Sequence, residues 1–261
     1  MNIGSSKPSQ VEREAVRHHL VDIVNPDFHF TAGDFCIRGS SAVAEITGRS
    51  MKPLIVGGTG FYINSFCNGI DEIPDIDESV VKAVACEYDN GCSDSLYEEL
   101  KKADIEFASK VHKNDRQRVI RGISVFRDTG RSISSYYNGK KENKNFETLF
   151  LGLYIEKEVL FKRIDLRVDS MIKNGLVDEV QSLRAMGYNR LLNSMQSIGY
   201  AEINQYIDGE TGLKSAIEDI KKNTKKYAKK QMTWFKKNKS VIWFSPDEIK
   251  KIPEIVKKWL N

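Results

Sequence analysis

The sequence lacks several features that would define its class at once. No apolar run approaches the ~18 residues that a membrane-spanning helix needs, and residues 1–7 contain no apolar core of the kind that secretory signals carry. The four cysteines, Cys36, Cys67, Cys86 and Cys92, form no C-x-x-C pair. These absences argue against a membrane protein. They predict free thiols in a reducing cytoplasm rather than a disulfide framework or a zinc site.

Familiar catalytic groupings are also missing. Two of the four histidines, His18 and His19, are adjacent, so on a strand they would face opposite ways. No Ser–His–Asp order, carboxylate pair or carboxylate–histidine spacing indicates a hydrolase or a metal site. We therefore expect structural histidines and no metal held by protein side chains.

The sequence does have the composition of a folded, charged protein. Its 261 residues are 40% hydrophobic and 29% charged, which suits one large domain or a core with an inserted subdomain. The net charge is only +4, but nine lysines and no acidic residue lie from Lys221 to Lys239. Such an asymmetry is typical of a polyanion-binding surface, although a solvated lysine face gives the same run.

The order of apolar runs predicts an α/β core. Strands are expected at 18–24 and 54–56, with helices at 31–49 and after Gly60. Strand, helix, strand, helix in this order implies a parallel sheet with right-handed crossovers. The later expected elements are strands at 148–155 and 240–244, helices at about 157–173, 176–187, 212–237 and 246–260, and a connector at 204–210 that ends a short helix.

The middle of the chain has a different character. An acidic, proline-marked connector occupies residues 70–77, and residues 78–104 have a helical pattern. Asp115 can cap a further helix that Gly130 ends, and residues 139–145 form a polar loop. We expect residues 1–74 and 148–261 to form the α/β core, and residues 75–147 to form a mostly helical insertion.

Residues 53–62, PLIVGGTGFY, indicate a ligand site at the edge of the sheet. An apolar strand would end in Gly57 and Gly58 and pass directly into a helix, whose free N–H groups attract anions. Thr59 would place a hydroxyl where α/β folds bind ligands. The spacing matches neither the dinucleotide fingerprint nor the Walker A loop, so glycines that serve only a tight turn and close packing are the alternative.

The lysine-rich segment predicts a long helix with an unusual stripe. Ile220, Thr224, Tyr227, Gln231 and Trp234 recur at spacings of three and four. Because the threonine and the glutamine are polar, they need hydrogen-bond partners if buried. Lysines flank this stripe, which suits a sugar–phosphate chain with stacked or hydrogen-bonded bases. A core helix with a solvated lysine rim is the alternative.

Arginines mark two further helices. Arg163 and Arg167 lie one turn apart, with Lys157 at the start of the same helix, and arginine suits bidentate phosphate contacts. Pairing with nearby carboxylates such as Asp165 would make them ordinary surface residues. Residues 117–121 carry a second arginine face, and residues 196–200, QSIGY, form a polar turn.

Taken together and in order, these motifs resemble the IPP transferase family of tRNA isopentenyltransferases, which prenylate N6 of the adenosine next to the anticodon. The matching stretches run through nearly the whole chain. They are MNIG and KP at 1–8, HHLVDI at 18–23, VGGTGFY at 56–62, ND and RVIR at 114–121, RI, RV and M at 163–171, GL and EV at 175–180, QSIGY at 196–200, and T, YAKKQ and TWF at 224–235.

The resemblance implies a P-loop-type α/β core with a helical insertion, and it assigns roles to residues already selected. Thr59 matches the threonine near the reacting adenine, Arg163 and Lys157 match two cations near the diphosphate and the tRNA, and the glycines would line the substrate site. The implied substrates are dimethylallyl diphosphate and tRNA, the implied cofactor is Mg²⁺, and we expect a cytoplasmic monomer. Substrate-binding positions are Gly57, Gly58 and Gly60; tRNA-binding positions are Gln117, Arg118, Val119, Ile120, Arg121, Met195, Gln196, Ser197, Ile198, Gly199, Tyr200, Thr224, Lys225, Lys226, Tyr227, Ala228, Lys229, Lys230 and Gln231.

The chain also departs from the family pattern. Lys157 stands where arginine is usual, which weakens a bidentate grip, and Ala201 stands where lysine is common. No G-x-x-x-x-G-K-[ST] motif occurs; in the family this loop supplies the diphosphate cradle and the Mg²⁺-linked hydroxyl, and the following aspartate acts on the adenine amine. The chain therefore resembles a member truncated at its N-terminus, and we expect little or no turnover from it. The alternatives are a tRNA-binding module without catalysis and a relative of small-molecule P-loop kinases.

Overall fold

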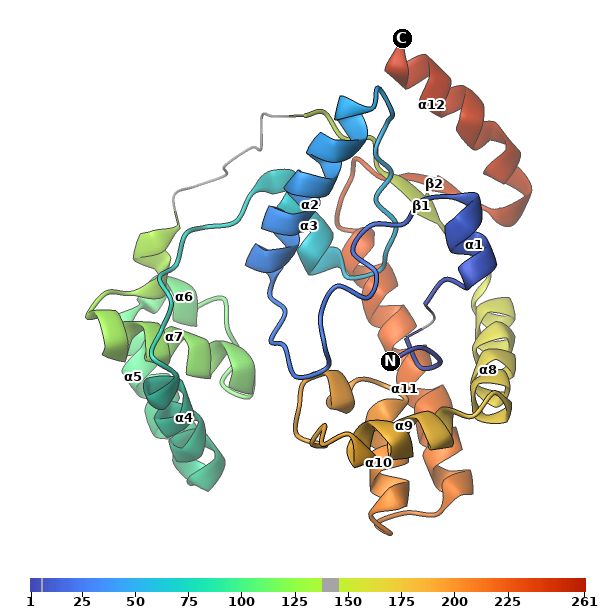
Figure 1. Cartoon of the computed structure of the whole chain (residues 1–261). Coiled ribbons are helices and arrows are strands. Elements are labelled where there is room, and N and C mark those ends of the chain that lie inside the picture. Colours follow the sequence, from blue (N-terminus) through green and yellow to red (C-terminus); the bar gives the residue numbers. More distant parts are fainter. Residues whose placement is uncertain (6, 138–145) are drawn as a thin grey trace. The chain divides into compact units, whose positions relative to one another are not determined.

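The structure, a computed structural model, describes residues 1–5, 7–137 and 146–261. By its internal contacts the chain divides into two compact units, whose ribbons are shown in Figure 1. Unit 1 comprises Met1–Cys67 and Lys144–Asn261, and unit 2 comprises Asn68–Asn143. The insertion expected at 75–147 overlaps unit 2, which begins earlier, at Asn68.

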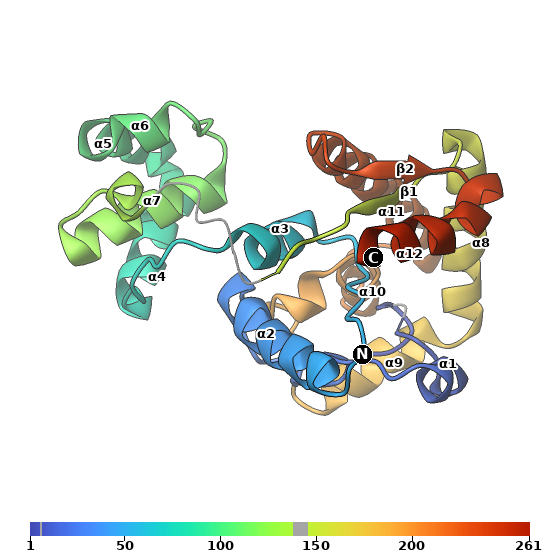
Figure 2. The ribbon, with the colours of Figure 1, turned by 90° about the horizontal axis from the view of Figure 1, so that it is seen from above.

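Unit 1 consists of helices around a short parallel sheet. In the described part of the chain, strands β1 (Leu151–Leu153) and β2 (Ile242–Phe244) pair in parallel, with Leu151 opposite Ile242. Figures 1 and 2 show the two strands side by side. The helices of this unit are α1 (Gln10–Ala15), α2 (Ala32–Gly48), α3 (Gly60–Asn68), α8 (Lys157–Lys173), α9 (Leu176–Ala185), η3 (Ser194–Gln196), α10 (Tyr200–Ile207), α11 (Leu213–Phe235), η4 (Pro246–Lys251) and α12 (Ile252–Leu260).

The main core of unit 1 lies among α8, α9, α10 and α11. Val168, Leu176, Val180, Ile203 and Ile220 are all fully or almost fully buried there. Val168, Leu176, Val180 and Ile220 come from the apolar stripes that the sequence predicted for 157–173, 176–187 and 212–237, because residues three and four apart share a helix face. Ile203 comes from α10. Burial of such side chains fixes the long basic helix α11 against its neighbours.

A cluster of aromatic rings joins α2 to α3 and so positions the turn in front of α3. The Phe35 ring lies 5.4 Å from the Tyr62 ring and 5.9 Å from the Phe66 ring, centroid to centroid. A Cβ atom on Gly39 would lie 2.9 Å from the Phe66 ring. The start of α2 is fixed by Thr31, whose side chain caps the helix together with Asp34.

Unit 2 is a helical unit with its own core. Its elements are α4 (Glu78–Glu87), η1 (Tyr88–Cys92), α5 (Ser93–Ala103), α6 (Ile105–Ala108), α7 (Arg116–Thr129) and η2 (Ile133–Tyr136). Asp115 caps the start of α7 and Gly130, with φ +68°, ends it, which confirms both predictions. The helical run expected over 78–104 is broken at Asn90 and Gly91, because Gly91 adopts φ +91°.

Two predicted strands are wrong. Residues 18–24 form bends, and Leu20 and Asp22 have φ of +60° and +57°, which no strand contains. Residues 54–56 pair with no strand in the described part of the chain, and Leu54 and Val56 are 81% and 85% exposed. The apolar run before the glycines is therefore not a buried strand here, and the parallel pair is formed by two later segments instead.

Several element bounds also differ from the prediction. The strands expected at 148–155 and 240–244 shorten to β1 and β2, and the helix expected at 246–260 divides into η4 and α12. Residues 204–207 belong to α10 rather than to a connector. The polar loop expected at 139–145 lies outside the described residues.

Candidate functional site

The glycine-rich turn before α3 lies against the C-terminal half of α11. The Nε2 atom of Gln231 donates a hydrogen bond to the carbonyl oxygen of Gly58 at 3.0 Å. A Cβ atom on Gly58 would lie 2.1 Å from that Nε2 atom, and one on Gly60 would lie 2.2 Å from Cδ1 of Trp234. Gly58 and Gly60 therefore allow the turn to approach the helix closely, which is the packing role that the sequence kept as an alternative.

Thr59 stands at the point where α3 begins. Its carbonyl oxygen accepts the N–H of Ile63 at 3.2 Å, which fixes the first turn of the helix. The residue is exposed, and its hydroxyl makes no hydrogen bond with a described residue. A hydroxyl that is open to solvent at the positive end of a helix dipole is available to a ligand.

The predicted stripe of α11 is only partly buried. Ile220 lies in the core, and the Thr224 hydroxyl donates to the carbonyl oxygen of Ile220 at 2.8 Å. Tyr227 and Trp234 are each 42% exposed. The two polar residues of the stripe therefore have their hydrogen bonds, one within the helix and one with the glycine turn, and the two aromatic rings keep surface on which a base can stack.

The lysines of α11 fall into two sets. Lys221 pairs with Asp169 at 2.8 Å and Lys225 pairs with Asp165 at 2.6 Å, both on α8. Lys214, Lys222, Lys226, Lys229 and Lys230 are exposed, and none of them has an ion pair with a described residue. The first two lysines hold α8 and α11 together, so the cations free for a polyanion are those of the second set.

Three ammonium groups surround one aromatic ring between α8 and α11. The Nζ atoms of Lys157, Lys225 and Lys229 lie 5.7, 5.6 and 5.5 Å from the centroid of the Phe161 ring. Of these cations only Lys225 has a carboxylate partner in the described part of the chain. Each ring contact is worth about 0.5–1 kcal/mol at an exposed site, so the cluster keeps unneutralised positive charge in one place.

Arg163 does not belong to that cluster. It is exposed and has no ion pair with a described residue. It lies six positions after Lys157 on α8, which places the two side chains about 120° apart around the helix axis. The two cations that the resemblance paired therefore lie on different faces of α8. Arg167, one turn after Arg163 on α8, is not without an interaction partner, so we do not count it among the free cations.

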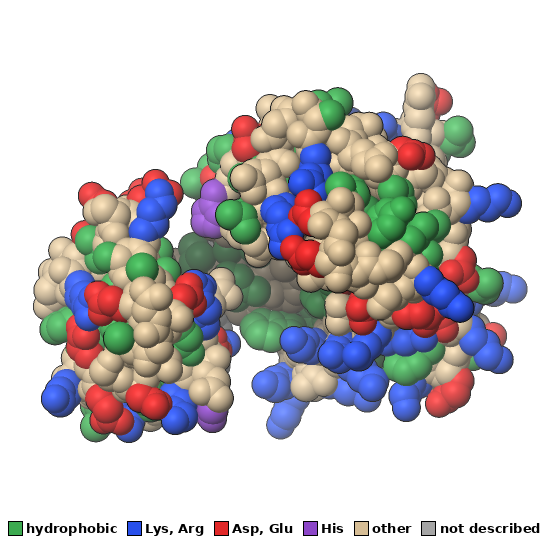
Figure 3. Space-filling model, turned by 90° about the horizontal axis from the view of Figure 1, so that it is seen from below, with side chains coloured by type: hydrophobic (Ala, Val, Ile, Leu, Met, Phe, Trp, Pro, Cys, Tyr) green, Lys and Arg blue, Asp and Glu red, His purple; other side chains and the backbone are tan. Residues whose placement is uncertain are grey.

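Figure 3 shows how charge is distributed on one face of the molecule. On unit 1, Lys and Arg side chains gather in a band with few carboxylates among them. On the smaller unit 2, basic and acidic side chains alternate over the visible surface. The positively charged band on unit 1 is therefore a better binding surface for a polyanion than the mixed-charge surface of unit 2.

The polar turn before α10 is held by buried side chains. The Nδ2 atom of Asn204 donates to the carbonyl oxygen of Met195 at 3.2 Å, and Oε2 of Glu202 accepts the N–H of Gly199 at 2.7 Å. Met195, Gly199 and Tyr200 are buried, Ile198 is half-buried, and Gln196 and Ser197 are exposed. Of the six predicted RNA contacts in this turn, only Gln196 and Ser197 present open side chains.

Tyr200 has a packing role. Its hydroxyl donates to Oε2 of Glu179 at 3.1 Å and accepts the N–H of Gly4 at 3.2 Å. Burial, with the nearby Glu179 carboxylate, raises the pKa of the Tyr200 phenol well above its usual range. A Cβ atom on Gly4 would lie 2.3 Å from the Tyr200 ring. The tyrosine thus anchors the first residues of the chain rather than facing solvent.

The predicted RNA contacts on α7 need a correction as well. Gln117, Arg118 and Arg121 are exposed, but Val119 and Ile120 are buried in the core of unit 2. Since an α-helix turns about 100° per residue, a run of five residues cannot all face one partner. The side chains of Val119 and Ile120 form core, and any RNA surface on α7 consists of the other three.

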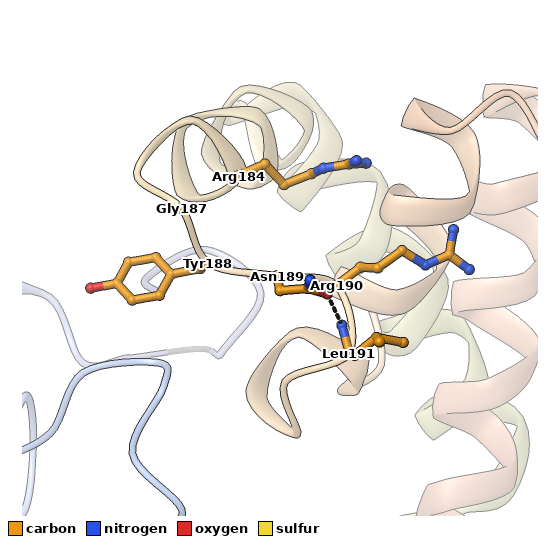
Figure 4. Close-up of a pocket in the computed structure, with 6 residues that line it drawn as sticks. All are labelled: Arg184, Gly187, Tyr188, Asn189, Arg190 and Leu191. Carbon is orange, nitrogen blue, oxygen red and sulfur yellow. Dashed lines mark hydrogen bonds between the residues drawn. The ribbon is translucent and has the colours of Figure 1, made fainter.

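A pocket of about 480 Å³ lies beside the polar turn, lined by Arg184, Gly187, Tyr188, Asn189, Arg190 and Leu191. Figure 4 shows the two arginine side chains extending to one side and the tyrosine ring to the other. Both guanidinium groups pair with Asp208, at 2.6 Å for Arg184, and they lower the pKa of that carboxyl. Because the arginines are neutralised, this pocket is a weak candidate for a phosphate.

Sequence reasoning missed Glu202, Asn204 and Asn223. The Oε1 atom of Glu202 accepts Nδ2 of Asn223 on α11 at 2.7 Å. Glutamate three residues after Gly199 is the spacing of a capping box, and this signal was present in the sequence. Nothing in a local pattern indicates the contact with Asn223.

Two further findings bear on partners. Among the described residues, no group of three or more His, Cys, Asp or Glu side chains is placed to hold a metal ion. In the same residues, no helix is both long enough and apolar enough to cross a membrane.

Comparison with known proteins gives consistent relatives. A tRNA dimethylallyltransferase of Caldanaerobacter subterraneus subsp. tengcongensis is 40% identical over 98% of this chain and 82% of its own length. The crystal structure of a tRNA delta(2)-isopentenylpyrophosphate transferase from Staphylococcus epidermidis matches with TM-score 0.67 and 34% identity, over 98% of this chain and 85% of that one. A eukaryotic dimethylallyltransferase acting on tRNA matches with TM-score 0.76 and 27% identity, over 93% of this chain and 63% of that one.

These solved relatives confirm the predicted fold class, a P-loop-type α/β fold, although the described part of this chain contributes only β1 and β2 to its sheet. The model of the family described as IPP transferase matches residues 1–238. With that match and relatives of about 40% identity along almost its full length, the chain belongs to the IPP transferase family.

Proposed function

We propose that this protein transfers a dimethylallyl group from dimethylallyl diphosphate to N6 of the adenosine next to the anticodon in tRNA. Family membership supports the reaction class. The observation that carries the proposal is the hydrogen bond between Gln231 and Gly58, because it joins a helix with free lysines to a turn with an open hydroxyl on Thr59. One helix can then hold the RNA and fix the turn beside the reacting groups.

The chemistry sets what the site must do. The allylic C1–O bond breaks, N6 bonds to C1, N6 loses a proton, and diphosphate leaves with the electron pair. Positive charge develops on the allyl group and negative charge on the diphosphate. Catalysis then depends on positioning and on cations and N–H groups aimed at the diphosphate. The target base must leave its stack to reach the site.

The side chains suit these tasks as follows. Thr59 would contact the reacting adenine or the prenyl group, and the exposed rings of Tyr227 and Trp234 would stack on unpaired bases. Lys157 and Lys229, beside Phe161, would hold phosphate oxygens. Arg163 lies on another face of α8, so we propose that it binds a different phosphate group from Lys157.

A metal ion is expected from the family, and Mg²⁺ is our proposal for it. The described carboxylate, imidazole and thiol groups do not form a set that fits one. The roles above therefore involve only the side chains of this chain. We further propose that the protein acts as a monomer, since each unit has its own buried core, and that it acts in the cytoplasm, where we place its tRNA substrate.

Product analysis tests the proposal. The protein is incubated with dimethylallyl diphosphate, Mg²⁺ and a tRNA that carries adenosine next to the anticodon, and the digested nucleosides are separated and weighed by mass spectrometry. The same assay is run on a version extended at its N-terminus with a Walker A loop, because the 261 residues contain no such motif. We expect dimethylallyl-adenosine from the extended version. Its absence there would reject the proposed reaction.

A second candidate function is tRNA binding without transfer. The free cations of Lys226, Lys229 and Lys230 favour it, because they serve RNA affinity independently of any phosphate loop. Tight, salt-dependent tRNA binding by both versions with no product from either would establish this candidate instead.

A further inference from the structure

Glu202 is a buried carboxylate with two hydrogen bonds that lead to different elements. It is 6% exposed, and it has no ion pair with a described residue. Oε2 accepts the N–H of Gly199 at 2.7 Å, and Oε1 accepts Nδ2 of Asn223 at 2.7 Å. Burying a carboxylate is costly unless both oxygens have partners, so these two bonds define its position.

One of the two bonds fixes the polar turn. Gly199 has φ +97°, a conformation that side chains with a Cβ rarely adopt. Its N–H is bound by Glu202, and the carbonyl of Met195 at the other end of the turn is bound by Asn204. Between these points Gln196 and Ser197 are exposed. The turn is thus held at both ends from α10, with its polar residues facing outward.

The other bond reaches the basic helix. Asn223 lies on α11, directly before Thr224 and one turn before Lys226. At the start of α10, Glu202 supplies the glutamate half of a capping box through its bond to the N–H of Gly199, and glycine has no side chain to return a second one. The bond to Asn223 adds nothing to that cap, and it ties the turn to the helix that carries the free lysines.

We propose that Glu202 is a positioning residue that sets Gln196 and Ser197 relative to α11, so that the turn and the helix engage one RNA together. This inference rests on the proposed function, since it requires tRNA as the ligand. Glu202 itself touches no RNA. Loss of its bond to Asn223 would leave both surfaces intact but no longer fixed to each other, which raises the cost of ordering them on binding.

The polarity of the hydrogen bonds supplies a sharp test. Asn223→Asp places two carboxylates against each other, which breaks the link. Adding Glu202→Gln restores it, because the glutamine amide donates to the new carboxylate on α11 while its oxygen still accepts the N–H of Gly199. Asn223→Ala removes the link without repulsion. Ser215→Asp is the matched control, since it adds the same charge to an exposed position of α11.

Binding of tRNA is measured for each variant by filter retention, with circular dichroism melting as the check on folding. We expect Asn223→Asp to weaken binding about tenfold or more, and the double variant to return within about threefold of the parent. Asn223→Ala should also weaken binding, and it should lower the melting temperature because it leaves Oε1 of Glu202 buried without its partner. It replaces Asn223→Asp as the test variant if Asn223→Asp does not fold, with binding measured well below its melting temperature. The control should bind nearly as the parent does.

Two results would overturn the inference: full binding by Asn223→Ala, or a folded double variant that binds no better than Asn223→Asp. Failure of the proposed function looks different, because it shows in the parent protein, either as no tRNA binding at all or as binding without any prenylated product. Hydrogen exchange at the Gly199 amide gives an independent readout. It should accelerate in Asn223→Asp and slow again in the double variant.

Discussion

The side-chain amide of Gln231 donates to the carbonyl oxygen of Gly58 at 3.0 Å, although 173 residues separate the two in the sequence. This bond joins the late basic helix to the early glycine turn. Trp234, one turn further along α11, lies where a Cβ atom on Gly60 would have to go. The turn is therefore positioned by a helix whose other surfaces carry free lysines, and the contact gives the site its shape.

Replacing Gly60 by alanine should destabilise the protein. The new Cβ atom would lie 2.2 Å from the Trp234 ring, and such overpacking costs about 1–3 kcal/mol. Gly57→Ala is the matched control, since its Cβ atom would meet only Ile63 Cδ1 at 4.0 Å, and its effect should stay within about 0.5 kcal/mol. Urea unfolding measures both free energies. Equal effects at the two glycines would refute the packing role of Gly60.

The same steric argument predicts a rescue. Adding Trp234→Ala to Gly60→Ala removes the ring that the new methyl group meets. The double variant should then be more stable than the sum of the two single changes indicates, by about 1 kcal/mol or more. Strict additivity in the double-mutant cycle would show that the two residues do not press on each other.

Lysines without carboxylate partners should dominate the salt dependence of tRNA binding. In the triple variant Lys226→Gln, Lys229→Gln and Lys230→Gln, the slope of log K against log salt should flatten by about 0.7 for each phosphate that is no longer neutralised. Binding is measured from low to high salt. In the pair variant Lys221→Gln and Lys225→Gln the slope should change less, because these lysines already bind Asp169 and Asp165. If the slope changed more in the pair variant than in the triple variant, Lys221 and Lys225 would be the main phosphate contacts, which contradicts the assignment.

Unit 2 should show an acid-dependent ion pair at Arg127. This guanidinium binds Glu87 at 2.7 Å and lowers the pKa of that carboxyl below its ordinary value of 4.5. A carboxylate with a lowered pKa stabilises the fold above its ordinary pKa, and this stabilisation is lost as the pH falls through the folded-state value. Arg127→Gln should therefore lower the urea midpoint at pH 7 and matter less at pH 3.

The control for that experiment is Arg131→Gln. Arg131 lies 4.8 Å from the Tyr136 ring centroid and has no ion pair with a described carboxylate. Its substitution should shift the urea midpoint by a similar small amount at both pH values. If Arg127→Gln lowered the urea midpoint equally at both pH values, the ion pair with Glu87 would not be the source of the stabilisation.

Local pattern predicted the helices better than the strands. The cap at Asp115, the stop at Gly130 and the stripe of α11 follow from neighbours in sequence, and all three are present. The runs at 18–24 and 54–56 failed because an apolar segment becomes a strand only if another strand pairs with it. Among the residues that the structure describes, Leu54 and Val56 have no such partner, and they are exposed.

The site was predicted as separate pieces. The glycine turn and Gln231 were both selected, but no local signal joins residues 173 positions apart. Val119 and Ile120 were carried into the RNA surface with their neighbours, although both are apolar and lie in the core of unit 2. Lys225 was counted as a free cation, because its partner Asp165 lies on another helix.

The most direct test of the site is the single-turnover rate of prenyl transfer by Gln231→Ala, in whichever version of the protein makes product. Thr233→Ala is the control, since the Thr233 hydroxyl donates to the carbonyl oxygen of Lys229 within α11 and bonds to no other described residue. The contact between Gln231 and Gly58 predicts a rate about tenfold lower or more for Gln231→Ala, with tRNA affinity within about threefold of the parent. A rate equal to that of Thr233→Ala would contradict the claim that this contact builds the site.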